Sequence, residues 1–336
     1  MQVTNYLLKI IIFVENIPMI SRNLIINSAK EVGFDLVGIV SSETLNLERE
    51  RFNEWLANGY HSTLSYLERN GDKRFAPTLL VEGTKSVIVC GTSYLSPYSR
   101  GYDKECATKV ASYALARDYH LTIKEMLREL AERLSAHHPD LRFRAFTDSA
   151  PLAEKSLAIK AGFGWIGRNS LVVNPHFGSM FNLGELLISE EVDGYDTPLQ
   201  GVGCGTCRRC VDSCPNGAIL DNHLIDTNLC ISCRTIEREG ENDNLNLDGW
   251  IFGCDACQTV CPFNRHAPLH TNPKFDPLFD PTTLSSEAWF NMTDEEFLSM
   301  ASTTPMPRAG LERIKANVIK NIASKSGNKS ESTASE

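Results

Sequence analysis

The sequence lacks both an apolar run long enough to cross a bilayer and an excess of positive charge. Its apolar stretch near the start, residues 7–14, is far shorter than the roughly 20 residues of a membrane-spanning helix, and no twin-arginine pair precedes it. The net charge of −9 argues against a general nucleic-acid coat, although local basic patches remain compatible with phosphate contacts. We therefore expect a cytoplasmic, monomeric protein that does not enter a membrane.

The chain is too long for one compact core. At 336 residues it exceeds the roughly 250–300 at which chains split into domains. We expect a fold of the α+β class, with the domains following one another along the chain. The predicted parts are an uncertain extension over 1–19, an α/β domain over 20–197, a cysteine-rich module over 198–265, a helical segment over 266–324 and a polar, disordered tail over 325–336.

Hydrophobic periodicity gives the α/β domain its expected elements. Helices are predicted over 21–32, 45–58, 121–137 and 152–161, and strands over 35–40, 85–90 and 142–146. Cys90 ends one of these strands and is expected to lie in the core.

Nine of the eleven cysteines lie between Cys204 and Cys261, with the spacing of iron–sulfur ligands. The segment 204–215 reads C-x2-C-x2-C-x3-C-P, in which three cysteines bind one cluster and the fourth binds a second cluster. Two [4Fe–4S] clusters need eight thiolates. The expected first set is Cys204, Cys207, Cys210 and Cys261; the second is Cys214, Cys254, Cys257 and either Cys230 or Cys233.

Two other uses of these cysteines are less favoured. A disulfide framework is typical of exported proteins, and we recognise no export signal. A zinc site favours two C-x2-C pairs, whereas this chain has a triad followed by C-P.

Residues 162–167 match the G-x-G-x-x-G pattern of dinucleotide-binding proteins. That pattern requires a strand before the glycines and a helix after them. Here a predicted helix precedes them and the strand-like segment 171–173 follows. We therefore interpret the glycines as sites of a turn or of a close backbone approach.

Six further segments occur together in a specific order: 147–154 (TDSAPLAE), 161–169 (AGFGWIGRN), 178–187, 230–237, 253–264 and 304–310. In combination with the cysteines they resemble the epoxyqueuosine reductases, cobalamin-dependent iron–sulfur enzymes of queuosine biosynthesis. The resemblance covers about residues 20–324. It implies an α/β cobalamin-binding domain, a ferredoxin-like module with two [4Fe–4S] clusters and a HEAT-like helical end.

The resemblance also implies an activity. Such an enzyme removes the epoxide oxygen of epoxyqueuosine at the wobble position of a tRNA, which is the last step of queuosine biosynthesis. Reduced cobalamin performs this chemistry, and the clusters carry electrons from an external low-potential donor. Among the cysteines, the family pattern selects Cys230 over Cys233, and Cys233 departs from that pattern as a free thiol or a substitute ligand.

Asp148 is the expected catalytic proton donor, because a carboxyl beside an apolar corrin would have a raised pKa. The alternative role of Asp148 is a helix cap. By resemblance, the expected cobalamin-binding residues are Arg74, Arg117, Asp148, Asn169 and Ser179. His120 is not expected to bind cobalt.

A basic surface is expected to bind the tRNA anticodon loop, with the candidates Arg208, Arg209, Arg234, Arg238, Arg308, Arg313 and Lys315. Three other functions remain open: a ferredoxin-like electron carrier, a dehalogenase-like cobalamin reductase of a small molecule, and a tRNA-binding protein without catalysis.

Overall fold

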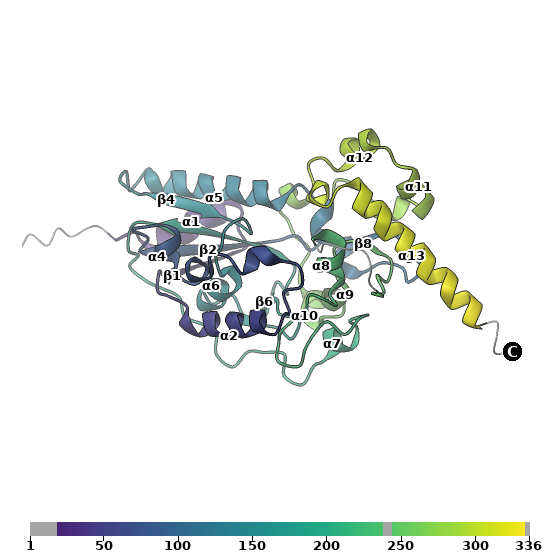
Figure 1. The fold of residues 1–336 in the computed structure, drawn as a ribbon. Helices are drawn as coiled ribbons and strands as arrows, with labels where there is room; N and C mark the ends of the chain where they lie inside the picture. Colours follow the sequence, from purple (N-terminus) through teal and green to yellow (C-terminus); the bar gives the residue numbers. More distant parts are fainter. Residues whose placement is uncertain (1–18, 238–243, 333–336) are drawn as a thin grey trace, which may run out of the picture.

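The computed structural model describes residues 19–237 and 244–332 (Figure 1). Most of the N-terminal extension and Arg238 lie outside the described residues. Figure 1 shows the sheet and its helices at one end of the molecule, the short helices of the cysteine-rich module beside it, and the helices α11–α13 at the other end.

The central sheet is antiparallel throughout. Its order is β1-β2-β7-β4, formed by β1 (Leu36–Ser41), β2 (Ser86–Ser93), β7 (Phe181–Ile188) and β4 (Phe143–Phe146). The three strands expected from periodicity are confirmed, and Cys90 is fully buried in β2. Strand β7 was not predicted, because Asn182, Gly184 and Glu185 interrupt its apolar pattern.

Helices cover both faces of this sheet. On one face lie α1 (Arg22–Val32) and α5 (Tyr119–Ser135), and on the other lies α6 (Glu154–Lys160). Helix α5 buries an apolar stripe with helical spacing: Ile123, Met126, Leu127, Leu130 and Leu134. It packs so closely on β7 that a Cβ at Gly184 would lie 2.4 Å from a methyl carbon of Ile123. The smaller helices are α2 (Asn46–Ala57), α3 (Gly71–Arg74) and α4 (Pro77–Leu80).

The cysteine-rich module consists mainly of loops and very short helices. These are α7 (Arg209–Asp212), α8 (Ile231–Ile236), α9 (Ala256–Thr259) and α10 (Pro262–His266). One small sheet joins it to the first domain, because β3 (Lys109–Val110) pairs in parallel with β8 (Trp250–Phe252). A second small sheet lies within the first domain, where β5 (Trp165–Ile166) pairs with β6 (Val172–Val173). Strand pairing therefore ties residues far apart in the sequence to the cysteine loops.

The C-terminal helices pack on this junction. They are α11 (Ser286–Asn291), α12 (Asp294–Ala301) and α13 (Leu311–Ser332), and they bury Trp289, Phe297 and Ile314 against Phe252 of β8. Short 3-10 turns lie at Ser65–Leu67, Pro97–Arg100, Ser112–Leu115, Pro273–Phe275, Pro281–Thr283 and Met306–Arg308. Helix α13 continues to Ser332, so the expectation of disorder from residue 325 is wrong up to that point. A helix already fixed by packing extends at little cost through polar residues that contain no proline.

The expected α+β class is confirmed. Among the described residues, no helix combines the length and apolar character needed to cross a membrane.

Candidate active site

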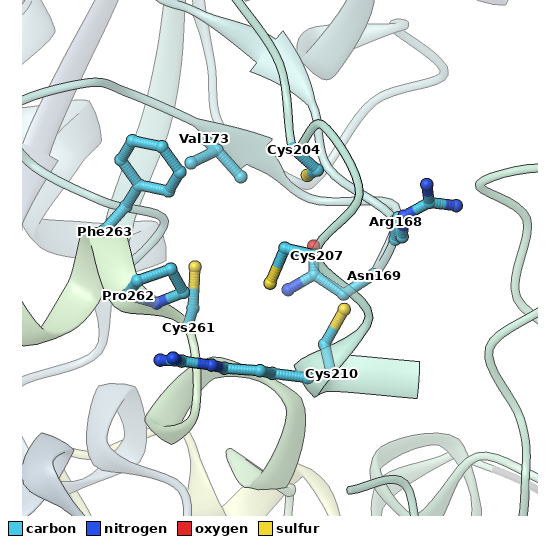
Figure 2. A pocket seen from close by; sticks show the side chains of 10 residues that line it. Arg168, Asn169, Val173, Cys204, Cys207, Cys210, Cys261, Pro262 and Phe263 are labelled. Atoms are coloured by element: carbon cyan, nitrogen blue, oxygen red, sulfur yellow. The ribbon is translucent and has the colours of Figure 1, made fainter. Parts of the chain in front are cut away.

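The four cysteines of the expected first cluster surround a single pocket (Figure 2). Cys204 and Cys207 come from the loop before α7, Cys210 lies in α7, and Cys261 immediately precedes α10. The remaining lining residues are Arg168, Asn169, Val173, Arg209, Pro262 and Phe263. Sulfur atoms from two distant segments thus face a common space, as the corners of a cubane require.

The other cysteines form a second, more deeply buried set. Burial raises the pKa of the Cys254 and Cys257 thiols, and the negative charge of Cys230 raises both further. Cys214 acts in the same way on Cys230 and Cys257. These effects require proximity, so Cys214, Cys230, Cys254 and Cys257 lie together.

Cys233 relates to this set through its backbone. Its amide N–H donates to the sulfur of Cys230, which is itself adjacent to Cys214. Within the described ranges, no three His, Cys, Asp or Glu side chains are gathered closely enough to hold one metal ion. A cubane is bound at its four corners, and its ligands are therefore spread more widely than those of a single ion.

Polar hydrogens point at sulfur in both sets. Trp165 Nε1 lies 3.3 Å from Cys204 Sγ, and the Ala218 amide nitrogen lies 3.3 Å from Cys214 Sγ. Asn169 lines the first pocket, yet its Nδ2 lies 4.0 Å from Cys257 Sγ of the second set. Asn169 therefore lies between the two groups of cysteines.

The glycine-rich segment 162–167 builds part of this environment. Helix α6 precedes it and β6 follows, which confirms the order expected from the sequence and disfavours a dinucleotide site. Gly164 has φ 154°, and a Cβ there would lie 1.9 Å from the carbonyl oxygen of Val173. The glycine permits the close pairing of β5 with β6, and β5 carries Trp165 toward Cys204.

A second pocket lies where the three parts of the chain meet. The first domain contributes Tyr113, Tyr119, His120 and Asp148. The cysteine-rich module contributes Ile236, Glu237 and Phe252, and the C-terminal segment contributes Pro305 and Arg308. Its wall is apolar where Ile236, Phe252 and Pro305 lie, and polar around Asp148. We call this space the acid pocket.

Asp148 has an unusual backbone and two polar neighbours. It lies just beyond β4 with φ 46°, a left-handed conformation that is uncommon for residues other than glycine. Tyr119 donates its hydroxyl hydrogen to Asp148 Oδ2 at 2.6 Å, and His120 Nε2 lies 3.6 Å from the same oxygen. The side chain is 55% exposed, so a molecule in the acid pocket has access to it.

The charge state of Asp148 follows from its neighbours. Burial pushes its pKa upward, but the hydrogen bonds of His120 and Tyr119 and the charge of His120 outweigh this and hold the pKa below its usual value. Hydrogen-bond donors thus favour the ionised carboxylate in the protein alone. The raised pKa expected beside a bound corrin stays a prediction.

The proton instead resides on His120. Burial lowers the pKa of His120, but Asp118 and Asp148 together raise it to about 9. Asp118 caps the start of α5, and its Oδ1 lies 2.7 Å from His120 Nδ1. The Tyr119 and His120 rings stack at 4.1 Å between centroids. The site thus holds a protonated imidazole beside an ionised carboxylate at neutral pH.

The rim of the acid pocket carries a second polar group. Glu237 accepts hydrogen bonds from Tyr66, at 2.9 Å, and from Arg308, at 3.1 Å. Burial and the charge of Glu237 raise the pKa of Tyr66. Arg308 therefore lies at the entrance to the pocket, near Asp148.

The expected cobalamin contacts do not all line the acid pocket. Arg74 is partly buried over the Phe52 ring, within electrostatic reach of Glu154. Arg117 forms a two-pronged ion pair with Glu125 at 2.6 and 2.7 Å. The side chain of Ser179 is buried and hydrogen-bonded to Gln258 and Asn264, while Asn169 lies at the cysteines.

The tRNA candidates also separate. Arg234 is only 3% exposed and contacts Asn317 of α13, so its assignment to a basic surface is wrong. The sequence pattern of α8 does not show this burial, which results from packing against α13. Arg208 pairs with Asp221, and Arg209 lines the first cysteine pocket. Arg313 and Lys315 are partly exposed on α13.

Sequence reasoning missed Tyr119 and His120 as neighbours of Asp148. Both residues directly follow Asp118, and the sequence did contain a signal for them. Asp118 caps the start of a helix, and an aspartate cap two residues before a histidine can hold the imidazole ring in place. Nothing in the sequence pattern joined these residues to Asp148, which is 28 positions beyond His120.

Comparison with known proteins agrees with this arrangement. Residues 74–149 match the family described as epoxyqueuosine reductase QueG, DUF1730, and residues 203–264 match a 4Fe-4S double cluster binding domain. The chain is 40% identical to an epoxyqueuosine reductase of Cyclobacterium marinum, over 88% of this chain and 96% of that protein. It is 37% identical to that of Escherichia coli, over 89% and 78%.

Solved structures are similar as well. One is an epoxyqueuosine reductase with an epoxyqueuosine-modified tRNA-Tyr stem loop, with a TM-score of 0.79 at 26% identity and coverage of 90% and 80%. Another is a Bacillus subtilis epoxyqueuosine reductase with its catalytic aspartate loop swung out of the active site, with a TM-score of 0.79 at 25% identity and the same coverage. The chain belongs to the epoxyqueuosine reductase family.

Proposed function

We propose that this protein reduces epoxyqueuosine to queuosine at the wobble position of tRNA. The observation that carries the proposal is the acid pocket, where Asp148, Tyr119 and His120 face an apolar wall beside two sets of four cysteines. Family membership supplies the substrate class, because a relative was solved with an epoxyqueuosine-modified tRNA stem loop. We further propose that the protein acts in the cytoplasm as a monomer.

The two clusters carry electrons in this proposal. Cys204, Cys207, Cys210 and Cys261 hold the first cluster, and Cys214, Cys230, Cys254 and Cys257 hold the second. An external low-potential donor reduces them one electron at a time. Tyr113 lines the acid pocket, and both Tyr113 and Cys254 pack against one buried apolar cluster, which supports placing the second cluster on the side of the reaction site.

Cobalamin fits the acid pocket by the character of its walls. Ile236, Phe252 and Pro305 provide an apolar surface for a large flat macrocycle. When bound, reduced cobalamin supplies the two-electron chemistry that breaks carbon–oxygen bonds. The proposed contacts of the cofactor stay Arg74, Arg117, Asn169 and Ser179. Arg74 is favoured among them, because Ser179 is hydrogen-bonded within the protein and Asn169 lies at the cysteines.

The protein's own residues supply protons. Conversion of an epoxide to an alkene and water consumes two electrons and two protons: the oxygen leaves both carbons and takes up both protons. Asp148 is the group that contacts the leaving oxygen, and His120 holds a proton at neutral pH beside it. Proton transfer from such a pair lowers the barrier as negative charge develops on the oxygen.

The tRNA binds across the mouth of the pocket. Arg308 lies at this rim, and Arg313 and Lys315 follow on α13. Single-stranded anticodon bases are readily splayed outward, which allows the wobble base to enter a pocket.

Replacement of Asp148 by asparagine tests the proposal. The variant keeps the shape but loses the carboxylate that contacts the leaving oxygen, so it should retain iron and tRNA binding and lose turnover by about two orders of magnitude or more. The readout is mass spectrometry of the modified nucleoside after anaerobic reaction, with Asp140→Asn, an exposed residue before β4, as the matched control. Equal turnover of Asp148→Asn and Asp140→Asn would remove Asp148 from the mechanism.

A further inference from the structure

Glu185 is an ionisable residue in the middle of the central sheet. It lies on β7, opposite Val89 of β2 and Phe146 of β4, and its side chain has no solvent exposure. Among the described residues, no N–H or O–H group donates a hydrogen bond to either carboxyl oxygen. A carboxylate buried without donors is strongly disfavoured, and burial accordingly raises the pKa of Glu185 well above its ordinary value.

The ionisable group that acts most strongly on Glu185 is a second carboxyl group. It belongs to Glu154, the first residue of α6, which packs on β7 and whose negative charge adds to the rise of the Glu185 pKa. Ionised carboxylates only accept hydrogen bonds, so two of them bond to each other only when one is protonated. Glu185 is the more deeply buried of the two, and therefore it is the one that donates.

Glu154 also contacts the catalytic loop. Its Oε1 accepts the backbone N–H of Asp148 at 2.5 Å. Asp148 has φ 46°, and a residue other than glycine stays in this conformation only when its surroundings hold it. Among the described residues, this amide bond acts directly on the Asp148 backbone. A continuous chain thus runs from the core of the sheet through Glu154 to the loop.

The charges around the pair are mixed. Burial and the negative charge of Asp148 raise the pKa of Glu154 to about 7. Other charged or titratable groups that act on Glu154 come from α5, α6 and α3: Tyr119, His120, Lys155 and Arg74. The two carboxyl groups therefore cannot both ionise at neutral pH, while the cationic groups favour one negative charge on Glu154.

We propose that Glu154 and Glu185 form a carboxyl pair that shares a proton and positions Asp148. The Glu185 hydroxyl donates to the Glu154 carboxylate, and that carboxylate accepts the Asp148 amide. Both are positioning residues, since neither lines the acid pocket. The inference rests on the proposed role of Asp148, but the hydrogen bond to the Asp148 amide can be measured without any turnover.

Three variants separate the pair from a purely structural role. Glu185→Gln keeps a hydrogen-bond donor toward Glu154 at every pH. Glu185→Leu removes the donor while filling the same apolar space. Glu154→Ala removes the acceptor of the Asp148 amide and leaves the sheet core intact, so it remains informative if the leucine variant folds poorly. Glu132→Gln, on the exposed face of α5, is the control.

The measurements are hydrogen exchange of the Asp148 amide by mass spectrometry and steady-state kinetics, both on protein that carries its two clusters. Glu185→Leu and Glu154→Ala should each accelerate exchange and lower kcat by about tenfold or more, with KM for tRNA unchanged, because a hydrogen bond to a charged acceptor is lost. The double variant should be no worse than Glu154→Ala alone, since both act through one contact. Glu185→Gln should stay within roughly twofold of the unaltered protein.

Two results would overturn the proposal. One is exchange within about twofold of the control in both Glu185→Leu and Glu154→Ala. The other is a Glu185→Gln variant as impaired as Glu185→Leu. Accelerated exchange in a protein that never deoxygenates epoxyqueuosine would support the pair and would overturn the proposed reaction instead.

Discussion

Replacing His120 with glutamine removes a charge whose contribution to stability depends on pH. In the folded protein the imidazole lies between Asp118, at 2.7 Å, and Asp148, at 3.6 Å, with 21% of its side chain exposed. Burial lowers its pKa, but the two carboxylates dominate and raise it from 6.5 to about 9. The folded state therefore binds this proton more tightly than the unfolded chain does.

The size and sign of the effect follow from this shift. Moving a pKa from 6.5 to about 9 corresponds to about 3 kcal/mol of added stability. For a group whose pKa is raised on folding, this stabilisation is fully present below pH 6.5 and is lost as the pH rises through about 9. Glutamine at this position keeps hydrogen-bonding capacity but carries no charge.

Thermal unfolding at two pH values measures the effect. At about pH 6, His120→Gln should unfold roughly 6 °C below the unaltered protein, and at about pH 10 the difference should nearly vanish. His137→Gln, an exposed histidine just beyond α5, is the control and should show no such dependence. An equal deficit at both pH values would refute the account of the His120 charge.

Three other predictions concern the clusters and the tRNA. Cys230→Ala should lose about half of the bound iron while Cys233→Ala keeps it, because the Cys230 sulfur lies close to Cys214 of the second set; full iron in Cys230→Ala would reverse this assignment. Trp165→Phe removes the N–H that faces Cys204 Sγ and should lower the reduction potential of the first cluster, since donors to sulfur favour the reduced form; an unchanged potential in an anaerobic redox titration would contradict this. Arg308→Gln should weaken tRNA binding and reduce the slope of log affinity against log salt by about 1, and an unchanged slope would place the phosphate contact elsewhere.

Local patterns predicted much of the fold. The stripe of α5 and the apolar strand β2 follow from spacing alone, and both are confirmed. Strand β7 was hidden because a buried glutamate occupies its centre. Apolar periodicity cannot identify a strand whose central position holds a buried charged residue type.

The candidate site was predictable where ligands repeat along the chain. The spacing of the cysteines indicated the two sets, and Asp148 stood out in a recognisable segment. The charge of Asp148 in the protein alone was not predictable, because it depends on His120 and Tyr119, which approach it only in three dimensions. Burial of Arg234 likewise depends on how α8 packs against α13.

The central claim is that this protein deoxygenates epoxyqueuosine in tRNA with the help of cobalamin. The direct measurement is anaerobic incubation of protein with both clusters, a strong reductant and tRNA from a strain lacking the reductase, with and without added cobalamin. Mass spectrometry of the digested tRNA then follows the modified nucleoside. The account predicts loss of one oxygen atom only when cobalamin is present. Unchanged epoxyqueuosine, with both clusters and cobalamin shown to be bound, would contradict it.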